Sequence, residues 1–292
     1  MSLYQELSYL ENSDLKTFSA VAANTFSFHH RLALSPLVQM DALRDLVRHM
    51  HDQRLSYHFE CAEGDPGGGW GSQPSGATLL DGFDALPSGN ALVILKSVHR
   101  HPDYAQFLSA FLEELGDVIR IGEVGQYKAP ICTIILASPN RITPYHMDDA
   151  HNFLMQVRGS KAFYVFDGTQ NDILSDRERE AFWGGNSNAA LLTEARQRQG
   201  VVYNLVPGSG IHVPMAYPHW AQNGPDVSVA VSVNFRPAQN RSADIHAFNS
   251  ALRRRGLHPR AAGQNRMVDD IKVAAFRTMS SLKQLGKRSV EG

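Results

Sequence analysis

The chain has 292 residues, of which 43% are hydrophobic and 20% charged, and its formal net charge is −1. This is an ordinary globular composition with ample apolar material for a core. The near-zero net charge gives no overall electrostatic case for binding nucleic acid or a membrane. The sequence contains no run of about 18 apolar residues, so no membrane span is predicted.

The cysteine content and the first residues indicate the compartment. Cys61 and Cys132 are the two cysteines of the chain. Two cysteines cannot build a disulfide framework, and no CxxC motif is present. Residues 1–7 lack a basic segment followed by an apolar run, so no secretion signal is predicted. We therefore expect a reducing, cytoplasmic setting.

Helical and extended segments are mixed in the first 123 residues. Apolar residues at helix spacing predict helices, β-branched and apolar runs predict strands, and the glycine-rich run Gly67–Gly71 predicts a flexible loop. In chain order we predict a helix at 41–50, a strand at 55–61, a loop at 64–76, a strand at 91–95 and an amphipathic helix at 104–119.

The pattern changes at about residue 124 and stays uniform to residue 237. Short β-branched or aromatic runs alternate there with Gly, Pro, Asn and Asp turns, which is typical of an antiparallel sandwich or barrel such as a jelly roll. A polar, partly helical insert covers residues 172–199. The predicted strands are 131–136, 153–157, 162–166, 200–206, 211–213 and 227–235.

The chain becomes helical again beyond Pro237, most clearly at 270–285, with a break at Arg253–Gly256. Residues 241–292 contain 11 Lys and Arg against 4 Asp and Glu, a net charge of +7 that leaves −8 for the rest. This basic segment could meet an acidic partner or a second subunit, or be a solvated helical face. We predict one domain, residues 1–292, with a β core at 124–237 and helical additions at 1–123 and 238–292.

The chemistry centres on His146 and Asp148. In an extended strand, residues i and i+2 point to the same face, so both side chains could reach one metal ion. A third ligand would complete the 2-His-1-carboxylate triad of non-haem Fe(II) oxygenases. His219 is the best candidate, since it begins a later strand that a jelly roll can bring opposite the first. Alone, His219 would more simply be a core histidine.

Four polar residues could bind a ligand beside the metal. Lys161 is either an exposed hairpin charge or, if it points inward like Phe163, a buried cation that needs a carboxylate. The second possibility would make it an anchor for an acidic cosubstrate. Thr143 could donate a hydroxyl, and Asn152 and Asn234 could donate amide hydrogens. Each of these three could equally be structural.

Other histidines lack the spacing to join a triad. These include His151 and His212, which are near the motif in the sequence. His212 lies in a predicted strand and is at best a residue behind the ligands or facing the substrate, and otherwise a core histidine. His29, His30 and the His99–His101 run are expected at the surface.

Two motifs together resemble a known family. They are Thr143-Pro-x-His146-x-Asp148-x-x-x-Asn152-Phe-x-x-Gln156-x-x-Gly159-x-Lys161 and Val213-Pro-Met-x-x-x-His219, followed by Val-x-Val-Asn234-Phe235. The pattern resembles the JmjC-type, cupin-like Fe(II)/2-oxoglutarate-dependent hydroxylases over about residues 135–237.

The resemblance implies a mainly β protein whose core is a double-stranded β-helix (a cupin-like jelly roll) flanked by N- and C-terminal helices. It implies Fe(II) bound by His146, Asp148 and His219. Lys161 and Thr143 would hold the distal carboxylate of the cosubstrate 2-oxoglutarate, with Asn152 and Asn234 near its chelating end. The family's upstream tyrosine for the cosubstrate has no assigned equivalent.

The implied reaction uses O2 to hydroxylate an amino-acid side chain in a protein, a peptide or a small molecule. A homodimer formed through the C-terminal helices is also implied. Two alternatives remain open: a metal-dependent cupin enzyme that does not use 2-oxoglutarate, and a non-catalytic regulatory protein. The Gly67–Gly71 loop and the 172–199 insert are expected to border the opening and to set selectivity.

Overall fold

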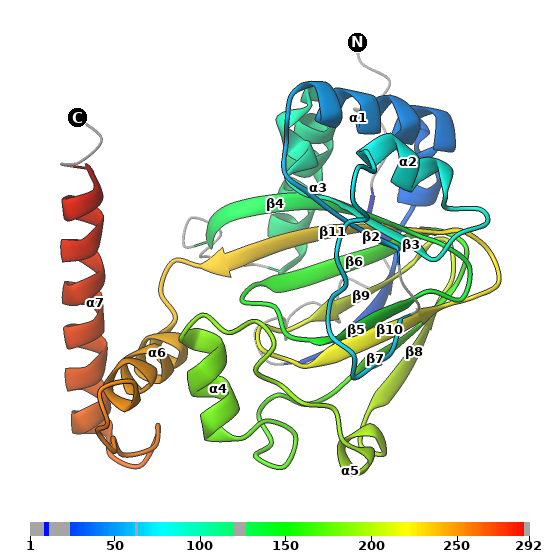
Figure 1. Cartoon of the computed structure of the whole chain (residues 1–292). Helices are drawn as coiled ribbons and strands as arrows, with labels where there is room; N and C mark the ends of the chain where they lie inside the picture. The colour runs from blue at the N-terminus through cyan, green and yellow to red at the C-terminus, as the bar shows by residue number, and fades with distance from the viewer. Residues whose placement is uncertain (1–8, 12–23, 62–63, 120–126, 289–292) are drawn as a thin grey trace.

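A computed structural model describes residues 9–11, 24–61, 64–119 and 127–288. Two antiparallel sheets face each other at its centre (Figure 1). The larger has the strand order β1-β9-β6-β11-β4-β3-β2, and the smaller has the order β5-β10-β7-β8. The N-terminal residues 1–7 and the first three residues of the predicted β core, 124–126, lie outside the described residues.

The strands agree closely with the predicted ones from residue 127 onward. They are β1 Phe26–His29, β2 Tyr57–Cys61, β3 Ala91–Leu95, β4 Tyr127–Ala137, β5 Ile142–His146, β6 His151–Arg158, β7 Lys161–Val165, β8 Val201–Leu205, β9 Ser209–Val213, β10 His219–Asn223 and β11 Ser228–Pro237.

The strands β4 to β11 form a jelly roll. Apart from the β7–β8 hairpin, each strand lies in the opposite sheet from the strand before it, so the chain winds around the space between the sheets. This arrangement sets β9-β6-β11-β4 against β5-β10-β7-β8. The predicted fold class, a double-stranded β-helix with helical additions, is confirmed.

The larger sheet is buried on both faces, which explains its nearly continuous apolar runs. Val229, Val231 and Val233 of β11 point into a core shared with the N-terminal helices. Ala230 of the same strand belongs instead to the apolar cluster between the two sheets. Residues of β11 that alternate with the valines therefore face the interior of the jelly roll.

Helices cover the outer face of the larger sheet on its N-terminal side (Figure 1). These are α1 Met40–Asp52, α2 Leu79–Asp84 and α3 Pro102–Ile119, with short 3-10 turns at Leu32–Leu34, Pro36–Val38 and Val98–Arg100. The insert after β7 forms α4 Asp176–Trp183 and the single turn α5 Glu194–Gln197. A Ser175–Glu178 capping box begins α4.

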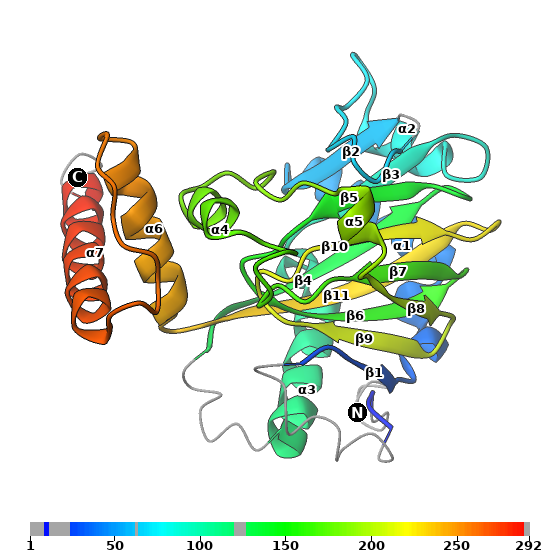
Figure 2. The same cartoon turned by 90° about the horizontal axis from the view of Figure 1, so that it is seen from below.

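The C-terminal helices stand to one side of the sheets (Figure 2). They are α6 Arg241–Arg253 and α7 Arg266–Arg288, and α6 packs between α4 and α7. The predicted break is present, because the chain turns at Gly256 with a φ of +79°. No helix of the described residues is long and apolar enough to cross a membrane.

Two features of the N-terminal part differ from expectation. Strand β1 was not predicted, and it extends the larger sheet by pairing with β9. His30, expected at the surface, is buried, and one ring nitrogen lies 3.1 Å from the carbonyl oxygen of Ser209. The hydrogen-bonded position beside β1 removes this histidine from solvent.

Candidate metal centre

The three predicted ligands converge at one end of the smaller sheet. His146 ends β5, His219 begins β10, and these two residues are register partners. Asp148 follows two residues after β5, and its Oδ2 lies 3.7 Å from Nε2 of His219. One nitrogen or oxygen atom from each residue lies within 4.8 Å of the others, so the three could hold one metal ion.

Backbone carbonyls orient both imidazole rings. Nδ1 of His146 lies 2.7 Å from the carbonyl oxygen of Pro144, and Nδ1 of His219 lies 2.9 Å from that of Tyr217. A carbonyl can only accept, so each Nδ1 carries the proton and each Nε2 keeps its lone pair. Both rings therefore offer Nε2 to a metal, the tautomer that outer hydrogen bonds fix in many metal sites.

Burial keeps His219 neutral. Its side chain is 3% exposed, and burial followed by the neighbouring His146 lowers its pKa from 6.5 to about 4. A neutral imidazole is the form that binds metal. The Asp148 side chain is 37% exposed, so the site opens to solvent on the carboxylate side.

A β-bulge places Thr143 beside the histidine. The register between β5 and β10 shifts between the pairs His219↔His146 and Ala221↔Thr143, so two residues of β5 lie opposite Trp220. Pro144 lies in this bulge, where its missing N–H costs no ladder bond. Because of the extra residue, Thr143 shares a face with Ala221, which belongs to the cluster between the sheets.

Lys161 points into the jelly roll, as its functional interpretation required. It begins β7, alternates with the buried Phe163 and is 4% exposed. Among the described residues no carboxylate lies within ion-pairing distance of its ammonium group. Burial lowers the pKa of Lys161 from 10.5 to about 8. The interior thus contains an unpaired cation, which is costly in the absence of a ligand.

The two asparagines lie opposite each other on β6 and β11. Asn234 donates an amide hydrogen to Oγ of Ser232 at 2.8 Å, and Ser232 donates its hydroxyl to Oδ1 of Asn152 at 2.8 Å. The buried Oδ1 of Asn234 has no hydrogen-bond partner. The two asparagines therefore retain an acceptor for a further hydrogen bond in the interior. Ser232, which links them, was not predicted from the sequence.

Tyr203 is a second interior residue that sequence reasoning missed. It lies on β8 opposite Phe163, and its ring packs against the cluster between the sheets. The alternation of Val201, Tyr203 and Leu205, read against β7, would have placed it there.

His151 and His212 lie away from the candidate metal centre. Both lie on the outer face of the larger sheet with Phe153 of the N-terminal core: His151 precedes Phe153 by two residues on β6, and His212 is the register partner of Phe153 on β9. Their nitrogens Nδ1 and Nε2 are 3.2 Å apart, and His212 stacks on Phe26 with ring centroids 4.9 Å apart. Both histidines are buried, and for His212 this is the simpler of its two interpretations.

The glycine-rich loop brings Trp70 against a candidate ligand. The Trp70 and His146 rings meet edge to face, with centroids 5.0 Å apart. Trp70 also contacts His58, whose Nε2 lies 3.1 Å from Oε2 of the buried Glu60. Glu60 pairs in turn with buried Arg141, the residue before β5. The loop is therefore anchored to the strand that carries His146.

Comparison with known proteins identifies the fold. No protein-family model matches the chain, and no curated protein matches its sequence. An X-ray structure of YcfD from E. coli is 17% identical, covers 94% of this chain and 68% of that chain, and gives a TM-score of 0.52. The chain has the JmjC-type, cupin-like fold.

Two further structures of that protein, described as a ribosomal oxygenase from Escherichia coli, contain cobalt. One holds succinic acid, at 16% identity and a TM-score of 0.51, and the other 2-oxoglutarate, at 15% identity and a TM-score of 0.52. Each covers 93% of this chain and 68% of the matched chain. The likeness to all three therefore concerns the fold.

Proposed function

We propose that the protein is an Fe(II)- and 2-oxoglutarate-dependent dioxygenase that hydroxylates an amino-acid side chain in a protein, a peptide or a small molecule. The observation that carries the proposal is the convergence of His146, Asp148 and His219 at one end of a jelly roll whose interior also contains the unpaired Lys161. The first feature fits a metal and the second fits an acidic cosubstrate.

The donor set fits iron. Two neutral imidazole nitrogens and one carboxylate oxygen are the facial triad of non-haem Fe(II) oxygenases, which leaves one side of the metal for other ligands. When bound, Fe(II) would supply the activation of O2, coupled to oxidation of the 2-oxo acid. The protein's own part is to fix Nε2 of both rings and to leave the carboxylate of Asp148 accessible.

The interior residues fit a dicarboxylate. Val165 is the register partner of His219, and Lys161 lies four residues earlier on β7, roughly 13 Å along the strand. A lysine side chain is shorter than this separation, which leaves room for a short dicarboxylate between the ammonium group and the metal. Lys161 would bind the distal carboxylate with Thr143, and Asn152 and Asn234 would lie near the chelating end.

The fold comparison supports this assignment. The matched E. coli protein is described as a ribosomal oxygenase and was solved with cobalt and 2-oxoglutarate. A ribosomal substrate favours a protein among the three substrate classes that we propose. We also propose a cytoplasmic setting, in which cysteines such as Cys61 and Cys132 stay reduced.

The proposal is tested without knowledge of the substrate. Co(II) is titrated into the protein under anaerobic conditions, followed by 2-oxoglutarate, and visible absorption is recorded. We expect one Co(II) per chain and a spectral change on adding 2-oxoglutarate, with succinate produced slowly once Fe(II) and O2 replace Co(II). Metal binding without a response to 2-oxoglutarate would favour the cosubstrate-independent cupin enzyme. No metal binding would favour the regulatory protein.

We also propose that a second copy of the chain covers α7. This helix stands off the sheets (Figure 2) and packs on α6, and Lys272 and Val273 are buried on one side of it. Its other side exposes Met267, Ile271 and Leu282 at 73%, 62% and 63%, all at helical spacing. Such a stripe on a helix about 35 Å long is suited to pairing with its own copy.

Light scattering tests the dimer. The wild type is expected at twice the chain mass, and the double variant Ile271→Glu and Leu282→Glu at the chain mass, since two charges would be buried in the contact. Leu257→Glu is the matched control, because Leu257 is 53% exposed but lies outside α7. A wild-type monomer at micromolar concentration would contradict the dimer.

A further inference from the structure

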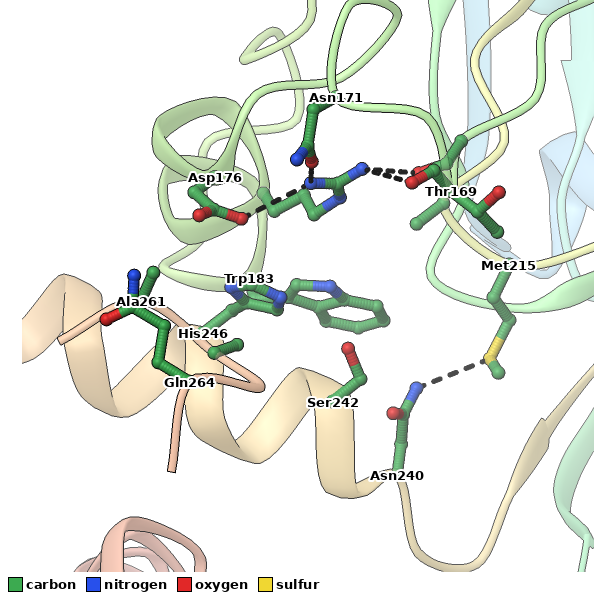
Figure 3. A pocket seen from close by; sticks show the side chains of 14 residues that line it. Thr169, Asn171, Asp176, Trp183, Met215, Asn240, Ser242, His246, Ala261 and Gln264 are labelled. Atoms are coloured by element: carbon green, nitrogen blue, oxygen red, sulfur yellow. Dashed lines mark hydrogen bonds and ion pairs between the residues drawn. The ribbon is translucent and has the colours of Figure 1, made fainter. Parts of the chain in front are cut away.

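A pocket of about 600 Å³ lies beyond the candidate metal centre, between the jelly roll and the C-terminal helices (Figure 3). Four segments surround it: the turn after β7, helix α4, the first turns of α6 and the linker between α6 and α7. Met215 and Ala216, in the connection from β9 to β10, close the remaining side. Helices α4 and α6 are additions that the jelly roll itself does not require.

One wall of this pocket also supports the metal ligands. The backbone N–H of Ala216 donates to the carbonyl oxygen of Asp148 at 2.8 Å, and Ala216 precedes His219 by three residues. Gly168 packs so closely on Ala216 that a Cβ at this glycine would lie 2.2 Å from the Ala216 carbonyl oxygen. A polypeptide that reaches the metal past the exposed carboxylate of Asp148 could therefore place a neighbouring side chain in the pocket.

The charges in the pocket neutralise each other. Arg179 donates through Nη1 to Asn171 at 2.7 Å and to Asp176 at 3.3 Å. Its Nη2 donates to the carbonyl oxygens of Gly168 and Thr169 at 2.9 and 3.1 Å. The guanidinium is thus engaged within the protein. The pocket offers no free cation for an acidic group, and its one carboxylate is already paired.

Apolar and uncharged polar groups share the rest of the surface, where Ser242 and Gln264 lie beside the apolar side chains. Trp183 lies across the middle of the pocket (Figure 3), with Met215 on one side and Ala261 on the other. His246 lines the pocket and is 4% exposed; its Nδ1 is fully buried without a hydrogen-bond partner, which leaves Nε2 as the ring nitrogen that a ligand could reach. Burial lowers the pKa of His246, which keeps the ring neutral. A neutral imidazole can accept or donate one more hydrogen bond.

We propose that this pocket binds an uncharged aromatic side chain with a hydroxyl group, as in tyrosine, from the polypeptide presented to the metal. Trp183 and Met215 would contact the ring, and His246 would bond the hydroxyl. The pocket is within the size range of small-ligand sites, whose few polar groups fix the orientation of an apolar ligand. The inference rests on the proposed function and names one determinant of its substrate.

The test measures binding of N-acetyl-L-tyrosinamide to the full chain by saturation-transfer NMR, with N-acetyl-L-phenylalaninamide for comparison. We expect the tyrosine probe to bind about fivefold more tightly, the effect of one neutral hydrogen bond. His246→Phe should bring the two probes to equal affinity. Ala262→Trp should weaken both about tenfold, because the indole would occupy the pocket. Leu257→Trp, in the same linker but outside the pocket, should change neither.

Two results would overturn the inference: equal binding of the two probes by the wild type, or binding that Ala262→Trp leaves unchanged. Adenosine and N-acetyl-L-lysinamide serve as competing probes, and tighter binding of either would also contradict it. The probes require no metal, so Co(II) and 2-oxoglutarate are titrated in the same samples. Failure of that titration, with tyrosine binding intact, would contradict the proposed function and leave the pocket assignment standing.

Discussion

The structure contains two pairs of histidines on neighbouring strands, and only one pair can hold a metal. His146 and His219 face each other across β5 and β10, with ring centroids 4.3 Å apart. His151 and His212 lie close to each other on β6 and β9 of the larger sheet, with centroids 5.4 Å apart. Both pairs include a buried ring with a lowered pKa.

The difference lies in where the Nδ1 protons go. In the first pair both protons go to carbonyl oxygens, so two lone pairs meet beside the carboxylate of Asp148. In the second pair Nδ1 of His212 donates to the carbonyl oxygen of Asn24. Its Nε2 therefore has the lone pair, which accepts a hydrogen bond from Nδ1 of His151. A close pair of histidines is therefore no sufficient sign of a metal site. Two lone pairs and a carboxylate must remain free together.

The sharpest test of this comparison removes a ligand. Asp148→Ala or His219→Ala should lower the rate of 2-oxoglutarate turnover by about 10³-fold or more, beyond the 10–100-fold typical of losing an outer-shell partner. Succinate formation and Co(II) binding measure the effect. The thermal midpoint of the metal-free protein should hold for Asp148→Ala, since this side chain is partly exposed. Full activity in Asp148→Ala would place the metal elsewhere.

The convergence of His146, Asp148 and His219 could be predicted because each of the two segments that carry them has its own short-range pattern. A His-x-Asp in an extended run and a histidine at the start of a later strand suffice once the strand pattern indicates a jelly roll. The inward position of Lys161 could also be predicted, since Lys161 and Phe163 are two residues apart on one strand and therefore point to the same face. The six strands predicted after residue 124 were correct because Gly and Pro turns separate them clearly.

Other features depend on contacts that no local pattern shows. Simple alternation would put Thr143 and His146 on opposite faces of β5, and only the bulge at Pro144 brings them together. The Ser232–Asn152 hydrogen bond joins residues 80 positions apart. Strand β1 has four residues and forms by pairing with a strand far along the chain. Such long-range pairings follow from the assembled sheet.

The second prediction concerns Lys161, the cation that separates a 2-oxoglutarate enzyme from a simple metal cupin. Lys161→Ala should raise the 2-oxoglutarate concentration needed for half-maximal turnover by about 10–100-fold, because a charge-assisted hydrogen bond worth about 1.5–3 kcal/mol is lost. The rate at saturating cosubstrate should change less. An unchanged requirement would remove Lys161 from the site.

The same lysine should affect stability in the metal-free protein. Its pKa is about 8 when folded and near 10.5 when unfolded, so above pH 8 the unfolded chain binds more protons. The free energy of unfolding should therefore rise between pH 8 and 10, by about 1–3 kcal/mol. Urea unfolding of the wild type against Lys161→Met isolates this contribution, since the variant lacks the group. If the free energy of unfolding changed with pH in the same way in the wild type and in Lys161→Met, Lys161 would not be a buried cation.

The third prediction treats the other histidine pair as a control. His212→Phe should leave turnover and Co(II) binding intact at pH 7.5, but lower the free energy of unfolding by about 1–3 kcal/mol, because the Asn24 carbonyl and the ring of His151 lose a partner. Loss of Co(II) binding in this variant would show that the second pair supports the first.

The pH dependence of that variant has a definite sign. Burial lowers the pKa of His151 to about 4 and that of His212 to about 3. Below pH 6.5 the unfolded chain binds protons that these folded rings do not, so stability falls as pH drops from 6.5 toward 4. His212→Phe should lose less stability over this range than the wild type. Unfolding in urea at pH 7.5 and 5 measures the difference.

The smallest predicted effect concerns Trp70, which brings the glycine-rich loop into contact with the candidate ligand His146. Its edge-to-face contact with His146 resembles aromatic pairs worth about 0.5–1.5 kcal/mol. Trp70→Ala should therefore weaken Co(II) binding by about 2- to 10-fold, and Trp70→Phe by less, since a smaller ring keeps part of the contact. Equal affinity in all three proteins would mean that carbonyl hydrogen bonds alone orient His146, as they do for His219.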